Sequence, residues 1–161
     1  MTTTSDVRDG TRVEKQGEHA IRTTRDFAAP PARVHRAMTD PELVAQWIGP
    51  EYLTNVEVTG GTSHGDTWTL VQQDPDGNQY AFRGVTHGES TPELTHRTFE
   101  WLGMEGHVSF EQLRLEDLGD GSTRVHGIAL FVSAEDRDGM FDSMQDGGYV
   151  RLDPLLATLR D

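Results

Sequence analysis

Charged side chains occupy two positions at which the expected strands place their apolar face. Arg25 is in phase with Phe27 on one strand, and Glu111 is in phase with Leu113 and Leu115 on another. A charge that faces the interior must be paired or neutral, because burial of a lone charge is costly. We therefore expect Arg25 to point into a cavity and meet a carboxylate, with Glu111 as first choice, or a ligand anion. The alternative is a structural ion pair, or an arginine at the end of the sheet that extends into water.

His107 shares the strand phase of Glu111 and adds a group that exchanges protons near neutral pH. General acid–base catalysis needs such a group inside a dry pocket. His107 and Glu111 are therefore the pair to suspect if the protein is an enzyme. The sequence contains no nucleophile elbow, phosphate-binding loop or dinucleotide fingerprint, so no residue is assigned a catalytic role.

Aromatic residues and methionines occur at phases consistent with one inner face of a sheet and a helix that covers it. The set is Trp68, Phe82, Phe99, Trp101, Phe131, Met140 and Met144. These residues are typical of a hydrophobic core. Alternatively, part of the set lines a pocket, since methionine adapts to irregular apolar ligands. In that case Tyr80, His87 and His107 are candidates for the polar contacts that orient the ligand.

A metal or cofactor site is not indicated by the spacing of the histidines. The seven histidines are scattered, with neither an HxH nor an HExxH pattern. The chain has no cysteine, which excludes disulfides, thiolate ligands and cysteine nucleophiles. We expect surface or structural histidines, no bound metal and no cofactor.

Charge and length restrict the class of partner. The 161 residues carry a formal net charge of −13, and their basic residues form no cluster. Such a surface repels phosphate backbones and anionic lipid, so we expect binding to neither nucleic acid nor membranes. No apolar run approaches the roughly 20 residues that span a bilayer, and the first residues do not form a secretory signal. These features predict a cytoplasmic protein, and the acidic surface and edge strands allow a homodimer.

The expected elements follow one another as a strand, two short helices, six strands and a helix. The strands are expected over residues 18–27, 53–59, 66–73, 79–88, 94–102, 107–116 and 123–132, and the short helices over 31–38 and 41–47. Thr39-Asp-Pro-Glu42 has the form of a capping box with proline in the first turn. Residues 1–17 are interpreted as a flexible tail.

The last segment has a helical period of apolar residues from Glu135 onward, with a kink or break expected near Gly147-Gly148 and Pro154. Short strands with tight turns form an antiparallel sheet. The predicted fold is α+β, with a curved antiparallel sheet of about seven strands around a long C-terminal helix. Cavities form readily between two such layers.

The residues also resemble a known family. Segments 21–41, 47–50, 97–108, 115–119, 135–140 and 151–156, together with Gly60-Gly61, Trp68 and Gly84, are similar to bacterial AHSA1-like proteins of the START-like (SRPBCC) superfamily. The resemblance covers about residues 18–160. It implies the helix-grip fold in a single START-like domain over residues 18–161. His35, Ile48 and Glu105 depart from the pattern, on elements expected to wall the cavity.

The resemblance implies three classes of function, because the family shares a fold and not a reaction. The first is a module that binds an apolar or aromatic small molecule without changing it. The second is a polyketide cyclase/aromatase-like enzyme, for which His107 and Glu111 would be the acid–base pair. The third is a partner that stimulates an Hsp90-type chaperone ATPase. The eukaryotic activator has a further N-terminal domain, for which residues 1–17 are too short, so small-molecule binding is the leading expectation.

Overall fold

The computed structural model describes residues 5–144 and 148–160. Its strands are β1 (Ser5–Arg8), β2 (Thr11–Gln16), β3 (Ala20–Phe27), β4 (Thr54–Thr59), β5 (Thr67–Gln73), β6 (Gln79–His87), β7 (Thr95–Trp101), β8 (Val108–Asp117) and β9 (Thr123–Leu130). Its α-helices are α1 (Pro31–Thr39), α2 (Pro41–Trp47), α3 (Ala134–Ser143) and α4 (Leu152–Thr158), and a 3-10 turn, η1, covers Leu102–Met104. None of these helices is long and apolar enough to cross a membrane.

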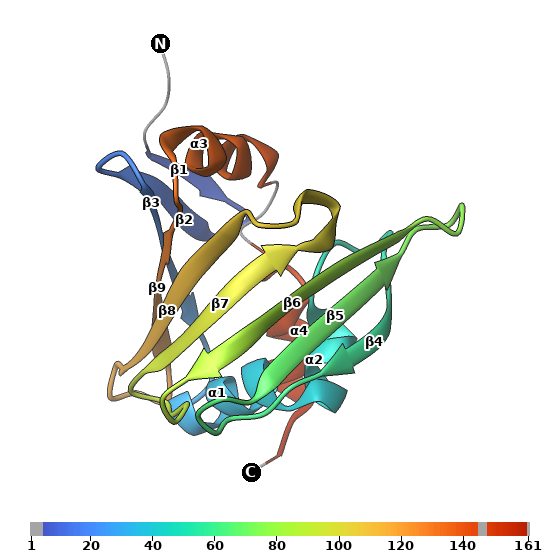
Figure 1. Ribbon diagram of the computed structural model, residues 1–161. Coiled ribbons are helices and arrows are strands. Elements are labelled where there is room, and N and C mark those ends of the chain that lie inside the picture. Colours follow the sequence, from blue (N-terminus) through green and yellow to red (C-terminus); the bar gives the residue numbers. More distant parts are fainter. Residues whose placement is uncertain (1–4, 145–147, 161) are drawn as a thin grey trace.

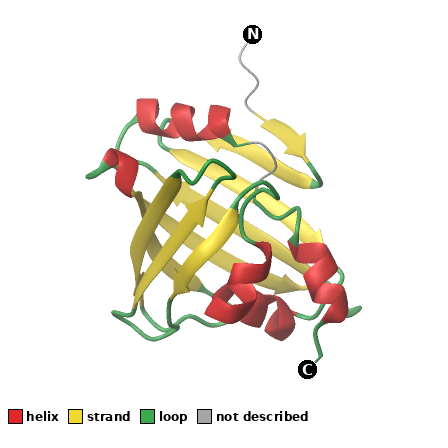
Figure 2. Ribbon diagram, turned by 90° about the vertical axis from the view of Figure 1, so that its right-hand side faces the viewer, coloured by secondary structure: helices red, strands yellow, loops and turns green. Residues whose placement is uncertain are grey.

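All nine strands form one antiparallel sheet in the order β1-β2-β3-β9-β8-β7-β6-β5-β4, so the two edges do not close on each other. Every neighbouring pair is also consecutive in the chain, except β3 and β9. Helices α1, α2 and α4 gather at the lower end of the sheet in Figure 1, and α3 lies across its upper end beside β1 and β2. Figure 2 shows that the sheet bends, so that its strands form facing walls around an interior.

The two short helices agree with the sequence-based expectation because their start signals are local. Pro31 and Pro41 each stand at a first helical position, where the missing N–H is not needed. The side chain of Asp40 caps α2 by accepting a hydrogen bond from the Glu42 amide at 3.0 Å. Asp40 therefore caps this helix, whereas Thr39 ends α1.

The N-terminal segment corrects two expectations. Residues 5–16 form β1 and β2 and do not form a tail, and the sheet therefore has nine strands instead of about seven. Asp9 and Gly10, both at positive φ, make the turn between them. The hairpin is held because Thr11 and Val13 are completely buried. Asp-Gly between two short extended runs is a strong hairpin signal.

The expected long C-terminal helix is also wrong, because two short helices take its place. The Ser133 side chain caps α3 by accepting from the Asp136 amide, and this helix ends before Met144 in extended backbone. Gly148 has a φ of 90°, which favours glycine and does not continue a helix. Gly147 lies outside the described residues. Pro154 falls in the first turn of α4, where it removes no helical hydrogen bond.

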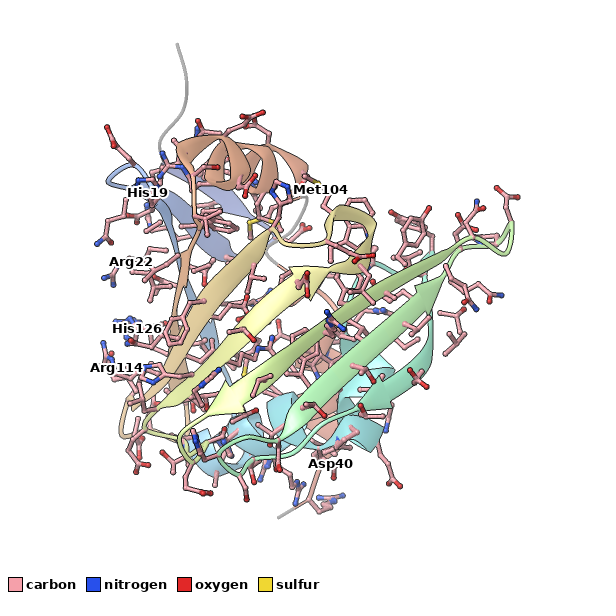
Figure 3. The ribbon with its side chains drawn as sticks, viewed as in Figure 1. His19, Arg22, Asp40, Met104, Arg114 and His126 are labelled. Atoms are coloured by element: carbon pink, nitrogen blue, oxygen red, sulfur yellow. The ribbon has the colours of Figure 1, made fainter. Side chains whose placement is uncertain are left out.

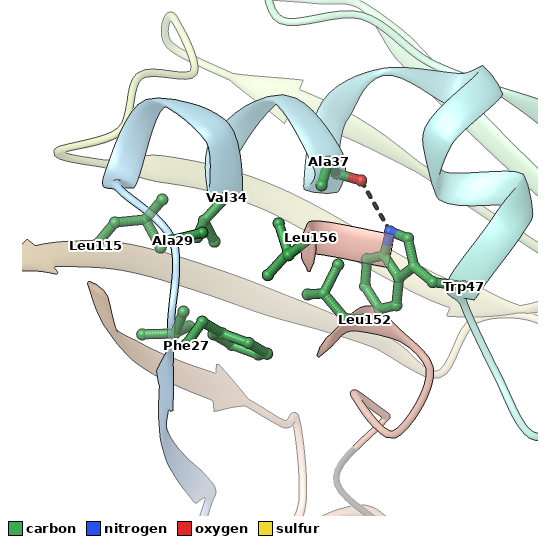
Figure 4. Packing of buried hydrophobic residues seen from close by; sticks show 9 residues of the cluster. Phe27, Ala29, Val34, Ala37, Trp47, Leu115, Leu152 and Leu156 are labelled. Atoms are coloured by element: carbon green, nitrogen blue, oxygen red, sulfur yellow. Dashed lines mark hydrogen bonds between the residues drawn. The ribbon is translucent and has the colours of Figure 1, made fainter. Parts of the chain in front are cut away.

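The main hydrophobic core lies at the lower end, between the sheet and α1, α2 and α4 (Figure 4). Its buried members are Phe27, Ala29, Val34, Ala37, Trp47, Leu115, Val125, Leu152 and Leu156. The Trp47 indole donates a hydrogen bond of 2.8 Å to the Ala37 carbonyl, so its one polar atom is satisfied inside the core. The apolar pattern of both short helices is thus used to close this end of the sheet.

A second and smaller cluster lies at the upper end, where Phe141 of α3 packs against Val13 and Ile21. Arg8 and Lys15 lie over the Phe141 ring at 4.5 and 5.1 Å from its centre. By contrast, charged and polar side chains lie on the outer face of the sheet. Figure 3 shows Arg22, Arg114 and His126 along it.

Candidate functional site

Arg97 and Glu111 form an ion pair on the inner face of the sheet. They stand directly opposite each other on β7 and β8, and Arg97 Nε donates to Glu111 Oε1 at 2.9 Å. The guanidinium also lies over the Trp68 ring, 4.8 Å from its centre. The two side chains keep 30% and 28% of their surface accessible, so each retains hydrogen-bonding atoms that a ligand can reach.

Arg25 does not meet Glu111, which corrects the first expectation. Its guanidinium donates to Asp153 Oδ2 on α4 at 2.6 Å, and it lies over the Phe27 ring. The reason is register. Strand β9 separates β3 from β8, and through β9 the partner of Arg25 is Leu115, four residues from Glu111. The structural ion pair, which was the alternative interpretation, describes Arg25.

Two chambers lie between the sheet and the elements that cover it. The first, of about 130 Å³, lies beneath α1 and α2. Its lining includes His35, Met38, Trp47, Val58, Trp68 and Leu70. The second, of about 180 Å³, extends toward α3. Its lining includes Ile21, Glu111, Ala129, Phe131, Met140 and Met144. Arg97, Phe99, Leu113 and Tyr149 line both chambers, and we call these four residues the partition.

Tyr149 reaches the partition from the loop before α4. Its ring packs edge-on against Phe27 at 5.6 Å and stacks on Trp47 at 6.0 Å between ring centres. Burial, followed by the charge of Glu111, raises the pKa of Tyr149 to about 12, so the hydroxyl stays protonated. The residue is only partly buried, and it lines both chambers. Among the described residues, nothing accepts a hydrogen bond from its hydroxyl.

Several residues expected at a site are brought together around the chambers. Trp68, Phe99, Glu111, Phe131, Met140 and Met144 line one chamber or both. Phe82 lies outside the lining but packs against Phe99, with ring centres 5.4 Å apart. The Trp68 indole donates to the Thr98 carbonyl across Gly84, which has no side chain to obstruct it. Trp68 is therefore fixed as a chamber wall.

Four other expected residues lie away from the chambers. The Tyr80 hydroxyl donates to Asp74, and His87 is exposed. Trp101 has 37% of its surface accessible to solvent. His107 is 48% exposed and pairs with Asp136 of α3 at 2.8 Å. The suspected pair of His107 and Glu111 is therefore not formed, because β8 begins only after His107 and Glu111 pairs with Arg97 inside.

Three polar residues of the site were not among those expected to bind a ligand. Arg97 is in phase with Phe99 on its strand, so the pattern that indicated Arg25 could also have indicated Arg97. His35 lines the first chamber, and its Nε2 lies 3.0 Å from Ser90 Oγ. Burial lowers the pKa of His35, which keeps the imidazole neutral. Tyr149 lies in a loop and had no periodic signal.

Metal ligation finds no support in the described part of the chain. Within residues 5–144 and 148–160, no group of three histidine or acidic side chains is placed to hold an ion. The polar groups of the chambers instead suit hydrogen bonding to an organic ligand.

Comparison with known proteins gives the family. A family model described as activator of Hsp90 ATPase homolog 1-like protein matches residues 28–160. The chain belongs to this family. The match confirms the resemblance to AHSA1-like proteins that the sequence shows. The fold is an α+β structure with a large antiparallel sheet. None of the curated proteins compared with the chain matches it.

Solved structures share this fold at low sequence identity. A protein from Rhodobacter sphaeroides has a TM-score of 0.85 at 21% identity, over 92% of this chain and 99% of that protein. A protein from Nitrosomonas europaea has a TM-score of 0.76 at 22% identity, over 89% and 97% of the two chains. DynU16, from the dynemicin biosynthetic locus, has a TM-score of 0.61 at 20% identity, over 87% of this chain and 48% of its own.

Proposed function

We propose that this protein binds a small apolar or aromatic molecule in the two chambers without changing it. The observation that carries the proposal is the lining, which is mainly aromatic and aliphatic. Arg97, Glu111 and Tyr149 lie in it together with His35, Gln112 and several serine and threonine residues. Binding sites for small molecules have this composition. A dry cavity of about 150 Å³ holds benzene, so each chamber suits a ligand portion of about one ring.

Native mass spectrometry of the protein purified from its own host tests this proposal. We expect a retained ligand of defined mass. Val58→Trp, which fills the first chamber, and Ala129→Phe, which fills the second, should reduce its occupancy. Val132→Trp is the matched control, because Val132 is 68% exposed. Retention that is equal in all four proteins would place the ligand outside the chambers and contradict the proposal.

A cyclase or aromatase activity is the second candidate. It is favoured by the presence of Glu111 and Tyr149 on chamber walls, and by the fold shared with DynU16 from a biosynthetic locus. In this proposal Glu111 takes the role of general base and the Tyr149 hydroxyl that of general acid. A linear polyketide should then be converted by the native protein and bound without conversion by Glu111→Gln. Equal conversion by both proteins would contradict this assignment.

Stimulation of a chaperone ATPase is supported only by the family description. The measurement is the ATPase rate of an Hsp90 homologue with and without this protein at high concentration. A rate increase that survives in Val58→Trp and Ala129→Phe would favour a surface contact over the cavity as the functional site.

A further inference from the structure

We infer that the ligand carries an uncharged oxygen acceptor, such as a ketone, and that this oxygen lies at the partition, where Arg97 and Tyr149 donate hydrogen bonds to it. The inference rests on the proposed binding function and adds the chemical class of the ligand.

Arg97 supplies the first hydrogen-bond donors. Arg97 uses only Nε in its bond to Glu111, and no other hydrogen bond of its guanidinium occurs within residues 5–144 and 148–160. An arginine carries five N–H donors, so those on the two terminal nitrogens remain for a ligand. Stacking over Trp68 and the bond to Glu111 hold this fork in place before a ligand arrives.

The second donor is the Tyr149 hydroxyl. It stays protonated at neutral pH because its pKa is raised to about 12, and no described residue accepts a hydrogen bond from it. Because Tyr149 is only partly buried and lines both chambers, a ligand oxygen there can accept the hydrogen bond of its hydroxyl. The charges of Glu111 and Arg97 both act on this group, which agrees with its place beside them in the lining. Two donors that line the same space are suited to one acceptor oxygen.

The charge of the site then distinguishes a neutral oxygen from a carboxylate. Glu111 already balances Arg97, so a ligand carboxylate would leave an uncompensated negative charge inside the protein. A buried charge of this kind is costly. The chain as a whole carries −13, which opposes the approach of an anion further. A ketone oxygen accepts the same hydrogen bonds without adding charge.

Both donors line both chambers, so the position of the oxygen is independent of the chamber that holds the ring. The two filling variants separate these cases. A ring in the first chamber is displaced by Val58→Trp, and a ring in the second by Ala129→Phe.

Isothermal titration calorimetry with ethylbenzene, acetophenone and benzoate tests the inference, because these ligands share a ring and differ in the oxygen. Tyr149→Phe should lower the affinity for acetophenone by roughly 3- to 10-fold, the range of one lost hydrogen bond, and leave that for ethylbenzene unchanged. Arg97→Lys, which keeps the charge but loses the fork, should show the same selectivity. Benzoate should bind at least about tenfold more weakly than acetophenone. Tyr80→Phe is the matched control, since Tyr80 bonds Asp74 outside the chambers.

Each other outcome overturns a defined statement. If Tyr149→Phe affects acetophenone and ethylbenzene equally, or neither, the oxygen does not lie at the partition, and ligand binding itself still stands. If benzoate binds more tightly than acetophenone, the partition is an anion site. If none of the three binds and native mass spectrometry finds no retained molecule, the binding function fails together with the inference.

Discussion

The two ends of the sheet are closed in different ways. At the lower end, nine buried apolar residues from α1, α2, α4, three strands and the loop before α1 pack into one core. At the upper end, three buried residues are supplemented by arginines, of which Arg137 donates to the carbonyls of Gly17 and Ala20. Close packing gives the first chamber a rigid floor. The second chamber is bounded by Met140 and Met144, whose flexible side chains can adapt to a ligand.

The largest expected difference is in the response to cavity-creating substitutions. Leu152→Ala at the lower end should lower the free energy of unfolding by about 2–5 kcal/mol, because Leu152 is completely buried. Met140→Ala at the upper end should cost clearly less, since Met140 is only partly buried. Urea denaturation measures both. Losses of equal size would mean that the two ends are packed alike.

The upper end should instead be sensitive to its arginines. Arg137→Met should lower the free energy of unfolding by about 1–3 kcal/mol, because two carbonyls lose their donor in a position where Arg137 is 6% exposed. Arg114→Met, on the exposed outer face, is the control and should change little. If both variants unfold at the same urea concentration, hydrogen bonds do not hold α3 to the sheet.

A smaller effect is expected at the helix start of the lower end. Asp40→Ala should cost about 1 kcal/mol, because it removes the hydrogen bond to the Glu42 amide that caps α2. Asp142→Ala, near the C-terminus of α3, removes a carboxylate of the same size without a cap and should be neutral or slightly stabilising. Thermal unfolding of both variants compares them directly. A cost in Asp142→Ala that equals that of Asp40→Ala would exclude capping as the cause.

The smallest effect is a pH dependence carried by the first chamber. Burial lowers the pKa of His35 in the folded protein, so below the ordinary value of about 6.5 the unfolded chain binds a proton that the folded protein does not. Above a pH of about 6.5 the contribution of His35 to the free energy of unfolding is therefore fully present. It is lost as the pH falls from there to the lowered pKa that His35 has in the folded protein. His35→Phe should remove this part of the dependence. Urea denaturation at pH 5 and pH 8 gives the free energy of unfolding at each pH. If the difference between the two values is the same in His35→Phe as in the native protein, the assignment to His35 is wrong.

The sequence predicts those elements of the fold whose signals lie within a few neighbouring residues, and it does not predict which distant strands pair. Pro31 and Pro41 fix the starts of α1 and α2 because capping involves only nearby residues. The Asp9-Gly10 turn is an equally local signal, but the polar composition of the residues around it favours a flexible tail. The pairing of Arg25 with Glu111 could not be tested by phase alone, since phase gives the face of a strand and not its neighbours or register.

The site follows the same distinction. Alternation places Trp68 and Phe99 on an inner face, with a core role as the first interpretation and a pocket wall as the alternative, and both residues line the first chamber. Tyr149 belongs to a loop, and only the tertiary structure brings it between Phe27 and Trp47. A partition made from residues of two strands and one loop has no signature in any one of these segments.

The order of the strands has a consequence for the rate of folding. Seven of the eight strand pairs join hairpin neighbours, but β3 pairs with β9, which places Ala20 opposite Leu130. To form this pair, the chain must close the long loop that runs from β3 to β9 through strands β4 to β8. Closing such a loop costs chain entropy before the contacts of the pair can compensate for it. The main core contains Phe27 of β3 and Val125 of β9, so it cannot assemble until this pair has formed. We therefore expect the β3–β9 pair to control the slow phase of refolding, with the hairpins on either side forming earlier.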